Sequence, residues 1–64
     1  RVYVNSDHES ALALIDGVSS NTAKKIVERR EKQLFMDRDE FLTWLREECK
    51  VELSADLKAR LVVS

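Results

Sequence analysis

The apolar positions of this chain form stripes at helical spacing, separated by short polar turns. Two stripes are long enough to predict well-formed helices, over about residues 21–32 and about residues 38–48. The first stripe places Ala23, Ile26 and Val27 on one face, with a densely charged face opposite. The second stripe is broader and carries aromatic residues; its members are Phe41, Leu42, Trp44, Leu45 and Cys49.

Weaker patterns on either side of these stripes predict two shorter helices. One is expected over about residues 7–15, and its inward positions are Ala11, Leu12, Leu14 and Ile15. The other is expected to follow Ser54 and to bury Leu57 and Leu61. Residues 2–4 and 61–63 are rich in valine, which favours extended ends that pair with each other or connect to a parent protein.

Polar residues at two of the expected helix starts have the spacing of a capping box. Ser6 is followed three residues later by Glu9, and Asp37 is followed in the same way by Glu40. In a capping box the two side chains satisfy backbone N–H groups that have no partner inside the helix. The pattern therefore predicts that the first helix begins near residue 7 and the third near residue 38.

The segment of residues 16–20 is expected to break the chain between the first and second helices. Gly17 is the only glycine in the chain, and it stands where a left-handed exit from a helix is needed. We therefore expect a positive φ at Gly17. Ser19 or Ser20 can then cap the second helix.

The largest side chains are expected to form the core. Trp44 and Phe41 are predicted to be buried against Ile15, Ile26 and Leu45, because a domain this small needs large aromatic side chains for burial. The connector over residues 33–36 carries three apolar residues and is expected to pack into the same core.

Length and composition narrow the class of protein. Sixty-four residues with no proline and one glycine suit a single all-α domain of four short helices with short extended termini. The longest apolar run covers only residues 11–15, which is too short for a membrane span or a signal peptide, and the single cysteine excludes an internal disulfide. The net charge of −1 argues against strong attraction to nucleic acid. Because the chain begins with Arg1 and not methionine, we expect it to be excised from a larger protein.

Residues 12–27 resemble the helix-hairpin-helix motif, a Gly-hydrophobic-Gly turn followed by an Ala-x-x-hydrophobic-hydrophobic helix. The matching positions are Gly17, Val18, Ala23, Ile26 and Val27, and Ser19 replaces the second glycine. Residues 2–6 are similar to the Val-x-Val-Asn-Ser lead-in of two families, the ComEA-type competence proteins and the minor pseudopilin K of type II secretion systems. Arg29-Arg30, Leu34-Phe35 and Asp37 are similar to the link that follows the motif in both families. The resemblance covers nearly all of residues 1–64 and implies a SAM-like fold.

The second half of the chain separates the two families. ComEA-type proteins carry a second glycine hairpin, which this chain lacks. Pseudopilin K often lacks the second glycine of the first hairpin and returns to its main body through a segment that residues 60–64 resemble. This resemblance implies a non-enzymatic assembly module for protein transport, on the periplasmic face of the inner membrane, with other minor pseudopilins as partners. The alternative is a nonspecific DNA-binding domain of the ComEA type, with duplex DNA as its partner.

The hairpin is the candidate phosphate-binding site of the alternative function. Backbone N–H groups at the start of the second helix, next to basic side chains, favour an anion. Residues 19–33 carry five basic and two acidic side chains. The alternative interpretation is that these basic residues form a solvated helix face. Asp16 favours this alternative, because it adds negative charge beside the turn. The candidate residues are Gly17, Val18, Ser19, Ser20, Lys24 and Lys25.

No catalytic, metal or cofactor site is predicted. Residues 37–48 carry five carboxylates and two arginines, but capping accounts for two of the carboxylates, and a solvated or partner-facing surface is the simpler interpretation. His8 lacks a neighbouring nucleophile in the sequence and is expected at the surface. Cys49 is expected to pack as a small apolar side chain.

Overall fold

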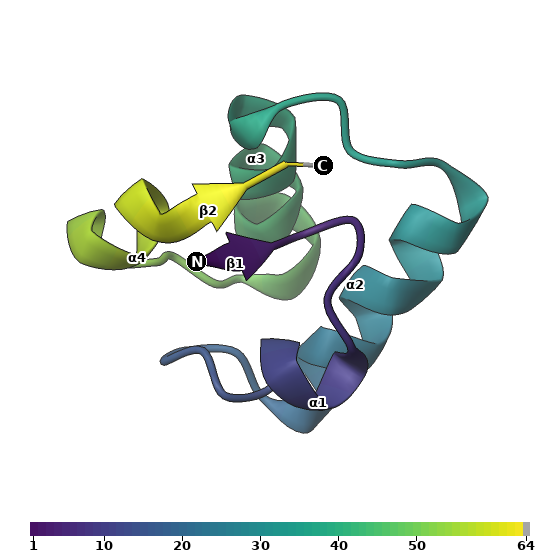
Figure 1. The fold of residues 1–64 in the computed structure, drawn as a ribbon, viewed down its shortest axis with the longest axis horizontal. Coiled ribbons are helices and arrows are strands. Elements are labelled where there is room, and N and C mark those ends of the chain that lie inside the picture. The colour runs from purple at the N-terminus through teal and green to yellow at the C-terminus, as the bar shows by residue number, and fades with distance from the viewer. Residues whose placement is uncertain (64) are drawn as a thin grey trace.

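Four helices and two short strands make up the computed structural model, which describes residues 1–63 (Figure 1). The predominantly helical fold and the extended ends agree with the sequence prediction. In chain order the elements are β1 (Val2–Tyr3), α1 (Glu9–Leu12), α2 (Ser20–Lys32), α3 (Arg38–Cys49), α4 (Ala55–Arg60) and β2 (Leu61–Val62).

The two ends of the described chain pair as a parallel two-stranded sheet, which confirms that the extended ends meet. Val2 is opposite Leu61 and Tyr3 is opposite Val62. The backbone N–H of Val4 extends the pairing by donating to the carbonyl of Val62 over 2.9 Å. Figure 1 shows β1 and β2 side by side in front of α3. The last position of the segment that resembles a return strand, Ser64, lies outside the described residues.

Polar groups on the outer edges of the sheet are occupied by the chain itself. The N–H of Tyr3 donates to the Asp7 carboxylate over 3.0 Å, and the Tyr3 carbonyl accepts from the N–H of Asp7 over 2.8 Å. On the other strand, the Leu61 carbonyl accepts from the guanidinium of Arg38 over 3.3 Å. These contacts leave few groups with which a further strand could pair.

The core lies between the sheet and the helices, and within residues 1–63 α4 is the one helix that contributes no buried side chain to it. The first helix and the turn after it contribute three side chains, α2 contributes two and α3 contributes two. Leu61 is buried as predicted, whereas Leu57 is only half-buried. The buried apolar residues are Val4, Leu12, Ile15, Val18, Ala23, Ile26, Phe35, Phe41, Leu45, Leu53 and Leu61.

Side-chain caps fix the starts of α2, α3 and α4. Ser19 caps α2 by accepting from the N–H of Thr22 over 3.2 Å, and Asp37 caps α3 by accepting from the N–H of Glu40 over 2.8 Å. The Glu40 carboxylate in turn accepts from the N–H of Met36 over 2.7 Å, one residue earlier than an ordinary capping box would place it. The predicted boundaries of α2 and α3 are therefore correct to within one residue.

The first helix is much shorter than predicted. It covers only Glu9–Leu12, and its N-cap is His8, whose side chain makes no capping hydrogen bond. The capping box predicted from Ser6 and Glu9 is therefore wrong, because the chain between β1 and α1 first turns back on Tyr3. The N–H groups of Ser6 and Asp7 both donate to the Tyr3 carbonyl, which delays the start of the helix.

Burial after α1 follows a period of three residues and not 3.6. The N–H of Ile15 donates to the carbonyl of Leu12 over 3.2 Å, and the N–H of Val18 donates to the carbonyl of Ile15 over 2.9 Å. These three side chains, each three residues apart, are all buried. The same tight turns carry Ala11 and Leu14 outward, and Leu14 is 84% exposed. The prediction that Ala11 and Leu14 face inward is wrong for this reason.

Phe35, and not Trp44, completes the aromatic core. Phe41 is buried as predicted, but Trp44 is only half-buried at the seam between α2 and α3. The Phe35 ring is buried and lies edge-on to both, with its centroid 5.0 Å from that of Phe41 and 5.4 Å from that of Trp44. The connector therefore inserts one side chain and not three, since Leu34 and Met36 are exposed.

Polar contacts hold that connector against the segment that follows β1. The Asn5 side chain pairs with the Phe35 backbone, donating to its carbonyl over 2.9 Å and accepting from its N–H over 3.0 Å. Arg30, on α2, donates to the carbonyl of Val4 over 3.0 Å. These bonds link residues about thirty positions apart in sequence and fix where Phe35 enters the core.

Candidate functional site

The turn between α1 and α2 has the backbone that the sequence predicts. Gly17 has a φ of 92°, in the left-handed region that favours glycine. A Cβ at this position would meet nothing closer than the Val51 side chain, at 4.0 Å. The requirement for glycine is therefore a requirement of the backbone and not of space.

Part of the predicted phosphate-binding group at this turn is already engaged. The N–H of Val18, one of the predicted anion donors, donates to the Ile15 carbonyl, and the Val18 side chain is buried. The Ser19 hydroxyl accepts from the Thr22 N–H and lies 3.1 Å from the Thr22 hydroxyl. Ser20 is exposed at the first position of α2. The turn therefore offers an anion fewer backbone donors than the sequence indicates.

The two lysines of the predicted site are exposed but border different surfaces. Lys25 borders the seam between α2 and α3, where it lies in a hollow shared with Trp44 and Glu48. Lys24 is one residue earlier on α2, and one residue is about 100° of helix rotation. Lys24 and Lys25 therefore project from α2 in different directions. Asp16 is exposed beside the turn.

The two arginines that would extend the basic face are held by the chain itself. Arg29 stacks on Phe35, with its guanidinium carbon 4.5 Å from the ring centroid, pairs with the Glu40 carboxylate at 3.9 Å and donates to the Gln33 carbonyl. Arg30 donates to the Val4 carbonyl. Both side chains are only half-exposed. Of the five basic residues on α2, only the three lysines are exposed.

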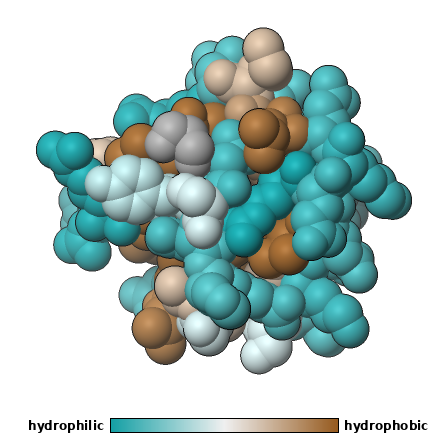
Figure 2. All heavy atoms as spheres, turned by 45° about the vertical axis from the view of Figure 1, so that its right-hand side comes forward, coloured by the Kyte–Doolittle hydropathy of each residue, from teal (hydrophilic) through white to brown (hydrophobic). Residues whose placement is uncertain are grey.

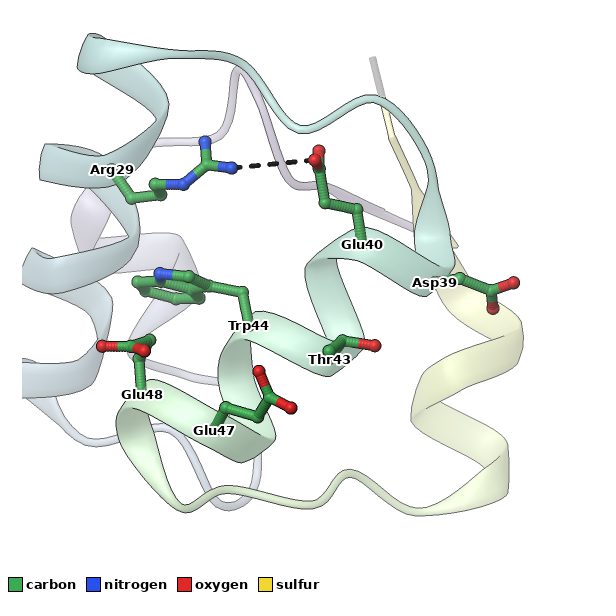
Figure 3. Close-up of a pocket in the computed structure, with 7 residues that line it drawn as sticks. All are labelled: Arg29, Asp39, Glu40, Thr43, Trp44, Glu47 and Glu48. Atoms are coloured by element: carbon green, nitrogen blue, oxygen red, sulfur yellow. Dashed lines mark ion pairs between the residues drawn. The ribbon is translucent and has the colours of Figure 1, made fainter.

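A groove that sequence reasoning missed runs along the seam between α2 and α3. Its larger hollow has a volume of about 390 Å³. Figure 3 shows Trp44 reaching from α3 toward α2, between Arg29 and Glu48. Figure 2 shows that hydrophobic side chains on the face it draws reach the surface as separate patches among hydrophilic ones. The lining residues are Arg29, Asp39, Glu40, Thr43, Trp44, Glu47 and Glu48.

A second hollow of about 240 Å³ adjoins the first and carries the opposite balance of charge. The two hollows share Arg29, Trp44 and Glu48. The larger one is bordered by four carboxylates and one arginine, and the smaller one by three basic and two acidic side chains. The seam is therefore acidic on its α3 side and weakly basic on its α2 side, with Trp44 where the two halves meet.

One signal in the sequence could have identified this groove. Glu47 and Glu48 follow Trp44 by three and four residues, so all three project from neighbouring positions of one helix face. The charge pattern indicates a possible partner-facing surface at the acidic residues of α3, but the apolar stripe places Trp44 in the core. Its position at the edge of the apolar stripe, beside carboxylates, is the feature that favours a half-exposed ring.

The remaining titratable residues form no further site. His8 is exposed, as predicted. Cys49 packs at the edge of the core, and burial together with nearby Glu48 raises the pKa of its thiol, while Lys25 opposes the rise. Asp37 and Glu40 are occupied in capping, and within residues 1–63 no three acidic, histidine or cysteine side chains are grouped to hold a metal ion. Over the same residues, no helix has the length and apolar character to cross a membrane.

Comparisons of this chain with models of known protein families, with curated proteins and with solved structures found no match. What is established is therefore the coarse architecture, four helices and a small parallel sheet. The subfamily resemblance stays a prediction from the residues that carry it.

Proposed function

We propose that this chain is a non-enzymatic protein-interaction module, of the helix-hairpin-helix kind found in the minor pseudopilin K of type II secretion systems. In this role it belongs to a larger protein on the periplasmic face of the inner membrane. It contacts other minor pseudopilins at the tip of the pseudopilus. Its contribution is a folded surface and not a chemical step.

The observation that carries this proposal is the engagement of Arg29 and Arg30. A domain that grips duplex DNA needs several cations free to replace the counterions of the phosphates. Here one arginine is stacked on Phe35 and paired with Glu40, and the other is bound to the Val4 carbonyl. Both act in holding the fold together, so the basic charge counted along α2 overstates what a phosphate could meet.

The paired ends of the chain support the same proposal. β1 and β2 are parallel neighbours, so the lead-in and return segments that resemble those of pseudopilin K lie side by side. A domain of this shape can be carried on a larger body without disturbing its own core. The acidic surface of α3 also favours a protein partner, because it would repel a duplex near it.

The alternative function, nonspecific binding of duplex DNA, is favoured by one feature. Ser19 and Ser20 lie exposed at the start of the thirteen-residue helix α2, and Lys24 lies one turn further on. The N-terminus of such a helix attracts a phosphate. This arrangement would supply about two contacts, which corresponds to weak binding at physiological salt.

A DNA titration followed by fluorescence anisotropy at about 50 and 150 mM salt tests the proposal against its alternative. The proposal predicts weak or absent binding at the higher salt. The variant Lys24→Glu/Lys25→Glu removes the lysines of the candidate site, and Lys58→Glu/Arg60→Glu makes the same change of charge on α4 as a matched control. Micromolar binding that falls steeply with salt and is lost only in the Lys24→Glu/Lys25→Glu variant would contradict the proposal.

A further inference from the structure

We infer that the groove between α2 and α3 receives an arginine or lysine side chain carried by an extended segment of the partner protein, with Trp44 as the surface on which the cation rests. This inference rests on the proposed function and specifies the chemistry of its partner. It concerns a surface that shares only Lys25 with the predicted phosphate-binding group.

Trp44 is the first observation that supports a binding surface at this place. It is the only tryptophan in the chain, and it lies half-buried, bordering both hollows of the groove. One side of its indole ring packs against Phe35, at 5.4 Å between centroids and 63° between ring planes. The ring is thus held in place by the core while remaining accessible from the groove. A fixed aromatic ring is a good surface for a cation.

The carboxylates beside Trp44 supply the charge that selects a cation. Within residues 1–63 the only ion pair joins Arg29 to Glu40, so Asp39, Glu47 and Glu48 have no cationic partner. All three border the larger hollow. Figure 3 shows Glu48 next to the indole ring and Glu47 beside it, whereas Asp39 lies at the far, N-terminal end of α3 and points away from the ring. A cation entering from the α3 side therefore meets unpaired carboxylates, which disfavours an anionic ligand there.

The charge distribution across the groove favours a segment of protein over a small molecule. The two hollows meet at Arg29, Trp44 and Glu48; the larger is lined mainly by α3 and the smaller mainly by α2. Lys25 and Lys32 border the smaller hollow, so the segment that fits carries its cation toward α3 and a neutral or acidic residue toward α2.

The direct test is titration with a peptide of alternating arginine and valine, blocked at both ends, followed by Trp44 fluorescence and by the NMR shift of its indole N–H. We expect a saturable change, with shifts confined to α3 and the facing side of α2. A peptide in which citrulline replaces arginine keeps the shape and loses the charge, and it should bind at least about fivefold more weakly. Equal binding of the two peptides, or no saturable change at millimolar peptide, overturns the inference.

Variants at the surface separate the groove from a general electrostatic effect. Glu47→Gln/Glu48→Gln should weaken binding of the arginine peptide about fivefold, whereas Glu31→Gln/Glu52→Gln, which neutralises two exposed carboxylates elsewhere, should leave it unchanged. Because these residues are exposed, circular dichroism should show that both variants keep the fold. Identical losses in the two variants overturn the inference. So does a Trp44 shift that depends on protein concentration without peptide, since that identifies a second copy as the occupant.

The results of the peptide and DNA titrations distinguish failure of the groove inference from failure of the proposed function. Absence of peptide binding together with absence of DNA binding overturns the groove inference alone. Tight DNA binding that depends on Lys24 and Lys25 overturns the proposed function, whatever the peptide does.

Discussion

Arg29 illustrates why the charge of a residue does not reveal its role. In the sequence it is one of five cations on α2. In the fold its guanidinium lies over Phe35, pairs with Glu40 on α3 and donates to the Gln33 carbonyl at the end of α2. One side chain thereby joins α2, the connector and α3. The sequence indicates that a positive charge is present, but only the packing shows that this charge is committed within the domain.

Gly17 is the residue whose role was predicted most directly. Substitution by valine should destabilise the fold by about 1–3 kcal/mol, because a β-branched side chain strongly disfavours a positive φ. The surroundings add little, since the nearest heavy atom to a Cβ is 4.0 Å away. Chemical denaturation of the two proteins measures the difference in the free energy of unfolding.

Substitution at Lys50 provides a control, because its expected effect on stability is opposite to that of Gly17→Val. It ends α3 with a φ of 58°, a left-handed conformation that a non-glycine residue adopts at a cost. Lys50→Gly should therefore leave stability unchanged or raise it by up to about 1 kcal/mol. A Gly17→Val protein as stable as the unsubstituted chain would show that the turn does not depend on its positive φ.

At the scale of the elements, helices with a capped start and a clear stripe were predicted well. Ser19, Asp37 and Ser54 each accept a hydrogen bond from a backbone N–H three residues later, which is why the starts of α2, α3 and α4 could be read from the sequence. The first helix could not be read in this way, because its apolar residues fit a period of three residues as well as the α-helical period of 3.6. Backbone hydrogen bonds between residues three apart decided in favour of the tighter one.

Packing between the elements also explains why the sequence pattern favours Trp44, and not Phe35, as the central aromatic residue. A stripe shows which face of α3 is apolar but not which neighbour covers that face. Asn5 fixes the connector through two hydrogen bonds, and the ring of Phe35 then fills the space between α2 and α3. Trp44 is left at the seam. A contact between residues thirty positions apart cannot be inferred from local periodicity.

The packing predicts different costs for removing the two aromatic side chains. Phe35→Ala should destabilise the fold by about 3–5 kcal/mol, because the ring is buried and contacts both Phe41 and Trp44. Trp44→Ala should cost less, about 1–3 kcal/mol, because the indole is only half-buried. Thermal and chemical denaturation measure both costs.

Leu34→Ala is the matched control for the connector. Its side chain is 56% exposed, one residue before Phe35, and its removal should change stability by less than about 0.5 kcal/mol. A larger cost for Trp44→Ala than for Phe35→Ala would contradict the packing described here and restore Trp44 to the centre of the core.

At the scale of the whole molecule, the sheet closes the fold by joining its first and last described segments. The sequence predicts extended ends that can meet, but the parallel direction and the pairing of Val2 with Leu61 depend on where all four helices place those ends. The candidate site likewise has features that the sequence predicts and features that depend on the whole fold. The positive φ at Gly17 and the hydrogen bond of the Val18 N–H to Ile15 belong to the local turn, whereas the internal use of Arg29 and Arg30 follows from tertiary contacts.

Photo-crosslinking in the intact parent protein tests the central claim, that this domain is a protein-interaction module, most directly. A photoreactive amino acid would replace one exposed residue at a time: Thr43 in the groove, Ser20 at the turn, Leu14 beside α1 and Ala59 on α4. We predict that at least one of these faces forms an adduct with a minor pseudopilin in cells and that Ser20 forms none with DNA. Adducts with DNA at Ser20, without a protein adduct at any of the four positions, would contradict the account.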